Sequence, residues 1–153
     1  MAKICIVLAT YNGEKYLAQM LDSLVAQSRP ADMIIAVDDG STDSNAQILK
    51  NYTSKLPLQI TFSPKNQGHR EAFSKALEIA KEKLQPEDLV ALADQDDIWL
   101  PHKLSILEKE IGTVPSLIFG DAQVIDENGN VTAESWRADS HINLKTTIKH
   151  QIA

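Results

Sequence analysis

The chain is poor in cysteine: Cys5 is the single one among 153 residues, so no disulfide can form within it. This usage suits a reducing compartment. Because Cys5 lies in an apolar run, we expect a buried core thiol. Runs of lysine and arginine are also lacking, and the net charge is −6. The composition therefore argues against binding of nucleic acid through a basic surface.

Long apolar stretches are lacking too. The N-terminal run from Ile4 to Ala9 is too short for the apolar core of a signal peptide and far too short to span a bilayer. We therefore expect a cytoplasmic protein whose membrane association, if any, is peripheral and at the inner face. With 43% hydrophobic and 24% charged residues, the composition is that of an ordinary globular domain, and the length suffices for one core.

The sequence does contain a regular alternation of apolar patterns. Helices are predicted between short strands, because apolar residues recur there at helical spacing. The predicted strands cover residues 4–9, 33–37, 58–62, 89–93 and 117–119. The predicted helices cover residues 17–25, a short stretch with Ile48 and Leu49, residues 72–80, and a stretch that Pro101 opens, with Leu104 and Leu107 inward. VIDENGNV, residues 124–131, predicts a hairpin with Asn128-Gly129 as a two-residue turn.

Strands that alternate with helices predict an α/β fold: a mainly parallel sheet with helices on both faces, followed by a C-terminal β-hairpin. We expect one domain over residues 1–153. In such sheets, ligands bind beyond the carboxyl ends of the strands. Three polar clusters follow predicted strands, at residues 10–13, 38–43 and 94–97. They are remote in sequence, and the fold predicts that they meet along one edge of the sheet.

The third cluster is the most unusual, because the apolar run Leu89–Ala93 ends in three carboxylates within four positions, Asp94, Asp96 and Asp97. Residues two apart in an extended segment point to the same side, so Asp94 and Asp96 are expected to face one site with Gln95 turned away. Adjacent carboxylates resist ionisation unless a cation compensates, and Mg²⁺ or Mn²⁺ prefers such oxygen ligands. The alternative is a set of solvated loop residues, with Asp97 capping a helix near Pro101.

Four blocks of the chain resemble family 2 glycosyltransferases, which have the GT-A fold. In order they are IVLATYNGEKYLAQMLDSLVAQS, IIAVDDGSTDSN, NQGHREAFSKAL and LADQDDIWLPHKL, and they span most of residues 4–107. The form DQDDIWLP, with DAQVIDENGNV after it, is most similar to bacterial rhamnosyltransferase-like members that build surface polysaccharides.

The resemblance implies roles for particular residues in binding a nucleotide. Thr10 and Tyr11 would border the base, and Asp38 or Asp39 would accept a hydrogen bond from a pyrimidine N3–H, with Asp39 favoured. A turn around Gly40 is the alternative for that pair, although it needs only one aspartate. The remaining implied contacts are Asn66 and Gly68 near the nucleotide, Arg70 at a phosphate (with simple exposure favoured), Asp94 at the ribose and Asp96 at the metal.

Other polar and aromatic residues are expected to have structural roles. Ser41 and Asp43 would cap the following helix. His69 and His102 would be loop or surface residues, since no histidine has metal-ligand spacing to another. Trp99 and Trp136 could form a wall for a sugar, but packing is the favoured interpretation.

The implied reaction transfers a sugar from a UDP- or dTDP-sugar to a saccharide or lipid-linked saccharide acceptor, with inversion and with Mg²⁺ or Mn²⁺ as cofactor. In the family, an aspartate of a later motif removes the acceptor's proton. The acids after Asp97 do not match that motif; they are Asp121, Asp126, Glu127, Glu134 and Asp139. We therefore expect a C-terminally incomplete domain that binds donor and lacks the base. A non-catalytic nucleotide-sugar-binding module is the alternative.

Three other α/β classes are less compatible with the positions of the acidic residues. A receiver-type phosphorylation domain has its acidic pair after the first strand, whereas Asp38 and Asp39 follow the second. A haloacid-dehalogenase-like phosphatase needs an aspartate nucleophile after its first strand, where this chain has Thr10 and Tyr11. A nucleotidyltransferase would carry a glycine-rich basic loop there.

Overall fold

The computed structural model describes residues 2–111, 117–126 and 128–135. It comprises two compact units, residues 1–114 and 115–153, which are described separately. Among the described residues, no helix is both long enough and apolar enough to cross a membrane.

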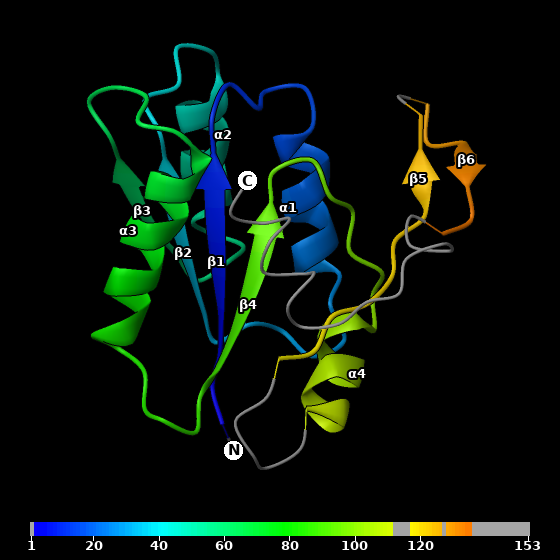
Figure 1. Ribbon diagram of the computed structural model, residues 1–153. Coiled ribbons are helices and arrows are strands. Elements are labelled where there is room, and N and C mark those ends of the chain that lie inside the picture. Colours follow the sequence, from blue (N-terminus) through cyan, green and yellow to red (C-terminus); the bar gives the residue numbers. More distant parts are fainter. Residues whose placement is uncertain (1, 112–116, 127, 136–153) are drawn as a thin grey trace. The chain divides into compact units, whose positions relative to one another are not determined.

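The first unit is built on a four-stranded parallel sheet in the order β3-β2-β1-β4 (Figure 1). The strands are β1 (Ile4–Thr10), β2 (Met33–Asp38), β3 (Leu58–Phe62) and β4 (Leu89–Asp94). All seven positions of β1 are buried, which is what a continuous apolar run predicts for a strand covered on both faces. Since all four strands run the same way, their carboxyl ends lie at one edge of the sheet.

Helices cover both faces of this sheet, as predicted. They are α1 (Leu17–Val25), α2 (Asn45–Tyr52), α3 (His69–Lys81) and α4 (Lys103–Glu110). Side chains of α1, α2 and α4 share a core with Ile4, Ile6 and Leu8 of β1, and α3 packs its alanines against the alternate residues Cys5, Val7 and Ala9. The period of two along β1 therefore divides one strand between two cores.

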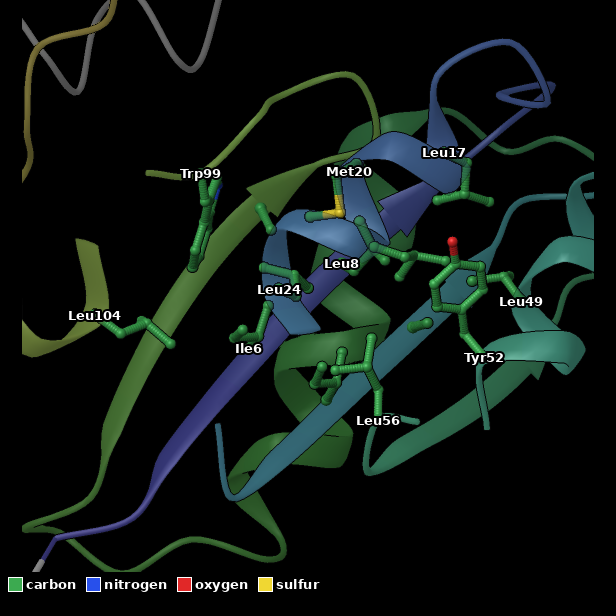
Figure 2. Close-up of a cluster of buried hydrophobic side chains, with 14 of the residues drawn as sticks. Ile6, Leu8, Leu17, Met20, Leu24, Leu49, Tyr52, Leu56, Trp99 and Leu104 are labelled. Atoms are coloured by element: carbon green, nitrogen blue, oxygen red, sulfur yellow. The ribbon is translucent and has the colours of Figure 1, made fainter. Parts of the chain in front are cut away.

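Figure 2 shows the larger core, where Ile6 and Leu8 lie beneath Leu17, Met20 and Leu24 of α1. Trp99 and Leu104 close the β4 side, and they are 3% and 2% exposed. Burying one such side chain contributes about 1.5–3 kcal/mol, so the apolar spacing read from the sequence is also what stabilises the helices on the sheet. The packing interpretation of Trp99 is confirmed; Trp136 lies outside the described residues.

The predicted start of the last helix was wrong by two residues. Pro101 lies in a turn before α4, in which Leu100 O accepts from Lys103 N at 2.9 Å. The segment just after α1 holds this turn: Pro101 O accepts from Ser28 N at 2.8 Å, and Leu100 O accepts from Gln27 Nε2 at 2.8 Å. These contacts take up the backbone carbonyls outside the helix, so α4 begins only at Lys103. Leu104 is buried as expected, and Leu107 is half-buried.

The second unit contains a β-hairpin, β5 (Val124–Ile125) paired antiparallel with β6 (Val131–Ala133). The hairpin was predicted correctly but its turn was not. Asp126 N donates to Asn130 O, and Gly129 N donates to Asp126 O, so the turn is longer than Asn128-Gly129. The carboxylate of Asp126 stabilises it by accepting from the backbone nitrogens of Asn128 and Asn130. The hydrogen bond from the Asn130 side chain, followed by the two backbone bonds, lowers the pKa of Asp126.

The predicted strand at residues 117–119 is absent, and this prediction was wrong. These residues take no strand conformation, and Leu117 is 64% exposed. A run of only three apolar residues cannot specify a strand by itself, because a strand also needs a ladder partner.

Candidate active site

A pocket opens at the carboxyl edge of the parallel sheet. Its walls come from the ends of β1 and β4, from the residue after β2, and from α3 with the loop before it. The lining residues are Ala9, Thr10, Tyr11, Asp39, Asn66, His69, Ala72, Asp94, Gln95 and Asp96. All three polar clusters of the sequence therefore meet at one edge, and six of the predicted site residues line one pocket.

Asn45 holds the β1 side of the pocket in place. It is fully buried at the first position of α2. Its Nδ2 donates to Thr10 Oγ1 at 2.9 Å and to Asp38 Oδ2, while its Oδ1 accepts from Gly13 N at 3.2 Å. One buried amide thus connects the loops that follow β1 and β2. The sequence offered no clear signal for this role, since Asn45 reads as an ordinary residue at a helix start.

Asp38 and Asp39 are both 2% exposed, but their surroundings differ. Asp38 is occupied within the protein, because its Oδ1 accepts from Ser41 N at 2.9 Å and its Oδ2 from Asn45. Asp39 lines the pocket, and its carboxylate accepts from Gln67 N and, at 2.7 Å, from Gly68 N. Asp38 therefore forms the turn, and Asp39 is the member of the pair that lines the pocket.

The loop 65–68 approaches β2 closely because of Gly40. This residue has φ +76°, and a Cβ built on it would lie 2.6 Å from the carbonyl carbon of Lys65 and 2.8 Å from Asn66 N. Asn66 lines the pocket from this loop. A residue larger than glycine at position 40 would push the loop away from β2 and so move Asn66. Gly68, at φ +98°, then begins α3 as its N-cap.

The first two residues of α3 differ in their relation to the pocket. Arg70 is exposed and does not line the pocket, which agrees with the favoured expectation of simple exposure. His69 is exposed, as expected, but it also lines the pocket. It interacts favourably with Asp94, where it opposes the rise in the carboxyl's pKa. The sequence did contain one indication of this location, because His69 directly follows the Asn-x-Gly loop that was expected near the nucleotide.

Asp94 and Asp96 both line the pocket, but Gln95 is not turned away and lines it too. The expected alternation fails because β4 ends at Asp94 and the chain turns at once. Burial, followed by the negative charges of Asp97 and Asp96, raises the pKa of Asp94. A cation at this position would relieve the repulsion. Within the described ranges, however, no group of three or more His, Cys, Asp or Glu side chains is placed to hold a metal ion.

Asp97 faces a different neighbour, Lys103 of α4. Burial raises the pKa of Asp97, the positive charge of Lys103 opposes that rise, and burial in turn lowers the pKa of Lys103. The Nζ atom of Lys103 lies 4.1 Å from the centre of the Trp99 ring. The N-cap residue of α4 is His102, and the first-turn nitrogen of Leu104 donates to Gln27 Oε1 at 3.1 Å. The alternative in which Asp97 caps this helix was therefore wrong; its charge instead lies near Lys103.

The expected caps of α2 are only partly present. Asp43 Oδ1 accepts from Asn45 N at 3.0 Å, at the start of the helix, and its Oδ2 accepts from Glu14 N. Ser41 was predicted wrongly, because its Oγ accepts from Asn12 N at 2.9 Å instead. Asn12 has φ +46°, and its Oδ1 accepts a hydrogen bond from Thr42 N. These bonds join the β1 and β2 loops rather than cap a helix.

Comparison with known proteins identifies several glycosyltransferases. An uncharacterized glycosyltransferase of a Nostoc species is 34% identical over 103 residues, which are 67% of this chain and 30% of that protein. The poly(ribitol-phosphate) beta-N-acetylglucosaminyltransferase TarS of Staphylococcus aureus is 34% identical over 99 residues, 63% of this chain and 17% of that protein. The chain thus spans less than a third of the length of these two relatives.

Solved structures agree with this similarity. TarS residues 1–349 in complex with UDP superpose with a TM-score of 0.62 and 30% identity, over 70% of this chain and 31% of that one. A mannosyltransferase from Pyrobaculum calidifontis, in complex with GDP-Man and Mn²⁺, has a TM-score of 0.51 and 23% identity over 63% of this chain and 28% of that one, and therefore supports the fold alone. The model of Glycosyl transferase family 2 matches residues 5–152. This chain belongs to glycosyl transferase family 2.

Proposed function

We propose that this chain binds a nucleoside-diphosphate sugar with a pyrimidine base, UDP or dTDP, in the pocket at the carboxyl edge of the sheet. The observation that carries the proposal is that three carboxylates line one pocket: Asp39 after β2, Asp94 at the end of β4 and Asp96 in the turn that follows. Thr10, at the end of β1, and Tyr11, just after it, also lie in the wall. In this proposal Asp39 would serve the base, Asp94 the ribose, and Asp96 the diphosphate. The TarS structures in complex with UDP and with UDP-GlcNAc agree with this ligand class.

The base end of the ligand would lie at Asp39. Its two oxygens share the backbone donors of Gln67 and Gly68, but Oδ1 accepts only one bond, of 3.1 Å. A carboxylate oxygen has room for a further donor, and a pyrimidine N3–H is such a donor. Asn66 and Tyr11 would border the base, Gly68 would support the loop, and Asp94 would approach the ribose. Asp38 would contribute indirectly, through Asn45, and Arg70 would meet a phosphate only if its exposed side chain reached back.

The diphosphate end would lie at Asp96 with Mg²⁺ or Mn²⁺. These ions often bind through one or two carboxylates and the oxygens of a substrate phosphate, so a single protein ligand fits this chemistry. When bound, the ion supplies Lewis-acid stabilisation of the charge on the departing diphosphate. Burial, followed by the negative charges of Asp97 and Asp96, raises the pKa of Asp94, and these neighbouring charges are the local feature that favours a cation here.

The reaction would be inverting transfer of the sugar to an acceptor hydroxyl. The new bond joins that oxygen to the anomeric carbon, the bond to the nucleoside diphosphate breaks, and a carboxylate takes the hydroxyl proton. We assign no described residue to that base. Asp126, for example, already serves the hairpin turn with its carboxylate. A domain that binds donor without transferring it is the second candidate function.

The acceptor would be a saccharide or lipid-linked saccharide of a surface polysaccharide. The support is the rhamnosyltransferase-like form of DQDDIWLP and the similarity to TarS, a poly(ribitol-phosphate) beta-N-acetylglucosaminyltransferase. The enzyme would then act in the cytoplasm, peripherally at the inner face of the membrane for a lipid-linked acceptor.

Calorimetry with UDP, dTDP, GDP and ADP, each with Mn²⁺ and with EDTA, tests the ligand class. We expect the pyrimidine diphosphates to bind more tightly than the purine ones. Equal binding of all four, or binding of none, would remove the proposal. Release of free sugar from UDP-sugars, followed alongside, separates a transferase from a non-catalytic module. Labelling by a small phosphodonor would instead indicate a receiver-type domain.

A further inference from the structure

The pairing of β1 with β4 continues beyond the end of β4, through a side chain. The last pair in the ladder is Ala9 with Asp94. Just past it, Gln95 Oε1 accepts from Tyr11 N at 2.7 Å, and Gln95 Nε2 donates to Tyr11 O at 3.0 Å. A carboxamide carries one acceptor and donors in a plane, like a peptide group. Gln95 therefore adds one further peptide-like link to the sheet, where the backbone of β4 has already turned away.

The geometry admits one orientation of this amide. Rotating the carboxamide by half a turn would place its NH₂ group against Tyr11 N–H and its oxygen against Tyr11 O. Gly13 makes the space: a Cβ built on it would lie 2.5 Å from Gln95 Oε1 and 2.8 Å from Gln95 Cδ. The glycine of the β1 loop and the glutamine of the β4 turn thus fit each other, although they are 82 positions apart (95 − 13).

The link joins the two ends of the pocket. Tyr11 borders one part of the wall, and Asp94 and Asp96 flank Gln95 in the other. Asp96 lies outside any strand or helix, and its carboxylate accepts no hydrogen bond from any residue that the structure describes. The residue before it, Gln95, is held by the two hydrogen bonds of its carboxamide to Tyr11.

We propose that Gln95 is a positioning residue: by clamping the backbone of Tyr11, it sets the spacing between the base-binding end of the pocket and the metal-binding Asp96. This inference rests on the proposed function, because it concerns the same nucleotide. Gln95 acts through Asp96 and does not itself need to touch the ligand. Its effect should therefore appear in the coupling between cation and nucleotide, and only weakly in nucleotide binding without the cation.

The test uses Gln95→Met in the full chain, which keeps the length of the side chain and removes both hydrogen bonds. Gln59→Met is the matched control, since Gln59 is exposed on β3, away from the pocket lining. The measured quantity is the ratio of UDP affinities with Mn²⁺ and with EDTA. Couplings between ligands are typically about 5–150-fold; we expect the ratio to fall to about twofold or less in Gln95→Met and to stay unchanged in Gln59→Met.

Two further measurements separate positioning from a general loss of structure. In the Asp96→Ala background, Gln95→Met should have no further effect on the Mn²⁺ ratio, because its route of action is gone. In the apo protein, NMR should show the Tyr11 amide exchanging at least about tenfold faster in Gln95→Met, as expected for a released donor, with the other β1 amides unchanged.

An unchanged Mn²⁺ ratio in Gln95→Met would overturn the inference, and so would an equal loss with and without Asp96. A third outcome is that the wild-type chain binds no UDP, while Gln95→Met still speeds exchange of the Tyr11 amide. The hydrogen bonds of the clamp would then be confirmed, but the proposed function and the positioning role would both fail. If UDP bound with its Mn²⁺ ratio intact and the Tyr11 amide did not respond, the clamp alone would be refuted.

Discussion

The carboxylate of Asp39 and the backbone nitrogen of Gly68 lie 2.7 Å apart, in a hydrogen bond that ties the end of β2 to the start of α3. The same carboxylate faces the pocket. Asp39 therefore supports a loop and is available to a ligand, so a simple truncation would disturb both roles.

The base contact can be isolated by changing the ligand as well as the residue. Methylation of UDP at N3 removes the donor that Asp39 is proposed to accept, and should weaken binding to the wild type by about 1–3 kcal/mol. In Asp39→Ala, where the acceptor is already gone, the same methylation should cost much less. Calorimetry of the four combinations gives the coupling. An equal cost of methylation in both proteins would show that Asp39 acts only on the loop.

The metal contact is expected to depend on Asp96. UDP should bind about 5–150-fold more tightly with Mn²⁺ than with EDTA, and Asp96→Ala should abolish this difference. Glu87→Ala is the control, because Glu87 is exposed before β4, at the opposite end of the strand from the pocket. The measurement is calorimetric titration of each variant. A full Mn²⁺ enhancement in Asp96→Ala would rule out the role of this carboxylate.

Asn45 should be important for stability as well as for the site. Asn45→Ala leaves the buried carboxylate of Asp38 and the hydroxyl of Thr10 without the donor that Asn45 supplies to each. We expect a loss of about 2–3 kcal/mol in the free energy of unfolding. Asn51→Ala, at an exposed position of the same helix, should cost less than about 0.5 kcal/mol. Urea denaturation compares them, and similar losses for both would contradict the role of the buried amide.

The acid dependence of stability should include a contribution from Asp32. Its carboxylate accepts from Ile4 N at 2.8 Å and pairs with Arg29 at 2.9 Å. The backbone bond from Ile4, and then Arg29, lower its pKa below the ordinary 3.8. A lowered folded pKa stabilises the protein above the unfolded value, and this contribution disappears as the pH falls through the folded value.

Asp32→Ala should therefore lower the free energy of unfolding by about 0.5–1 kcal/mol at pH 7, a small value because the side chain is 40% exposed. The difference from wild type should shrink as the pH falls below 3.8. Urea denaturation at a series of pH values measures this. A difference that is independent of pH would mean that charge plays no part.

The sequence predicted the framework well because the framework depends on local patterns. The run Ile4–Ala9 is apolar at every position, and β1 is buried at every position. The meeting of Thr10, Asp39 and Asp96 also followed from strand direction alone. Such features depend on periodicity and on the geometry of parallel sheets.

What the sequence did not reveal depends on contacts between distant segments. The strict alternation assigned to Gln95 holds only within a strand, and the length of β4 is set by its partner. The delayed start of α4 after Pro101 results from carbonyl contacts to the end of α1. The position of His69 in the pocket wall requires knowing how closely the loop before α3 can approach β2, which Gly40 decides.

The strand order of the sheet also has a consequence for the order in which the protein can fold. The central strand β1 emerges from the ribosome first, and β2 joins it after a short loop and one helix. Its other partner, β4, comes much later; Tyr11 and Gln95 are 84 positions apart, and closing long loops slows folding. Until β4 is synthesised, one edge of β1 has unpaired backbone N–H and C=O groups and is open to aggregation or chaperone capture. During synthesis, the wall of the pocket around Thr10 and Asp39 can therefore form before the acidic wall that completes it.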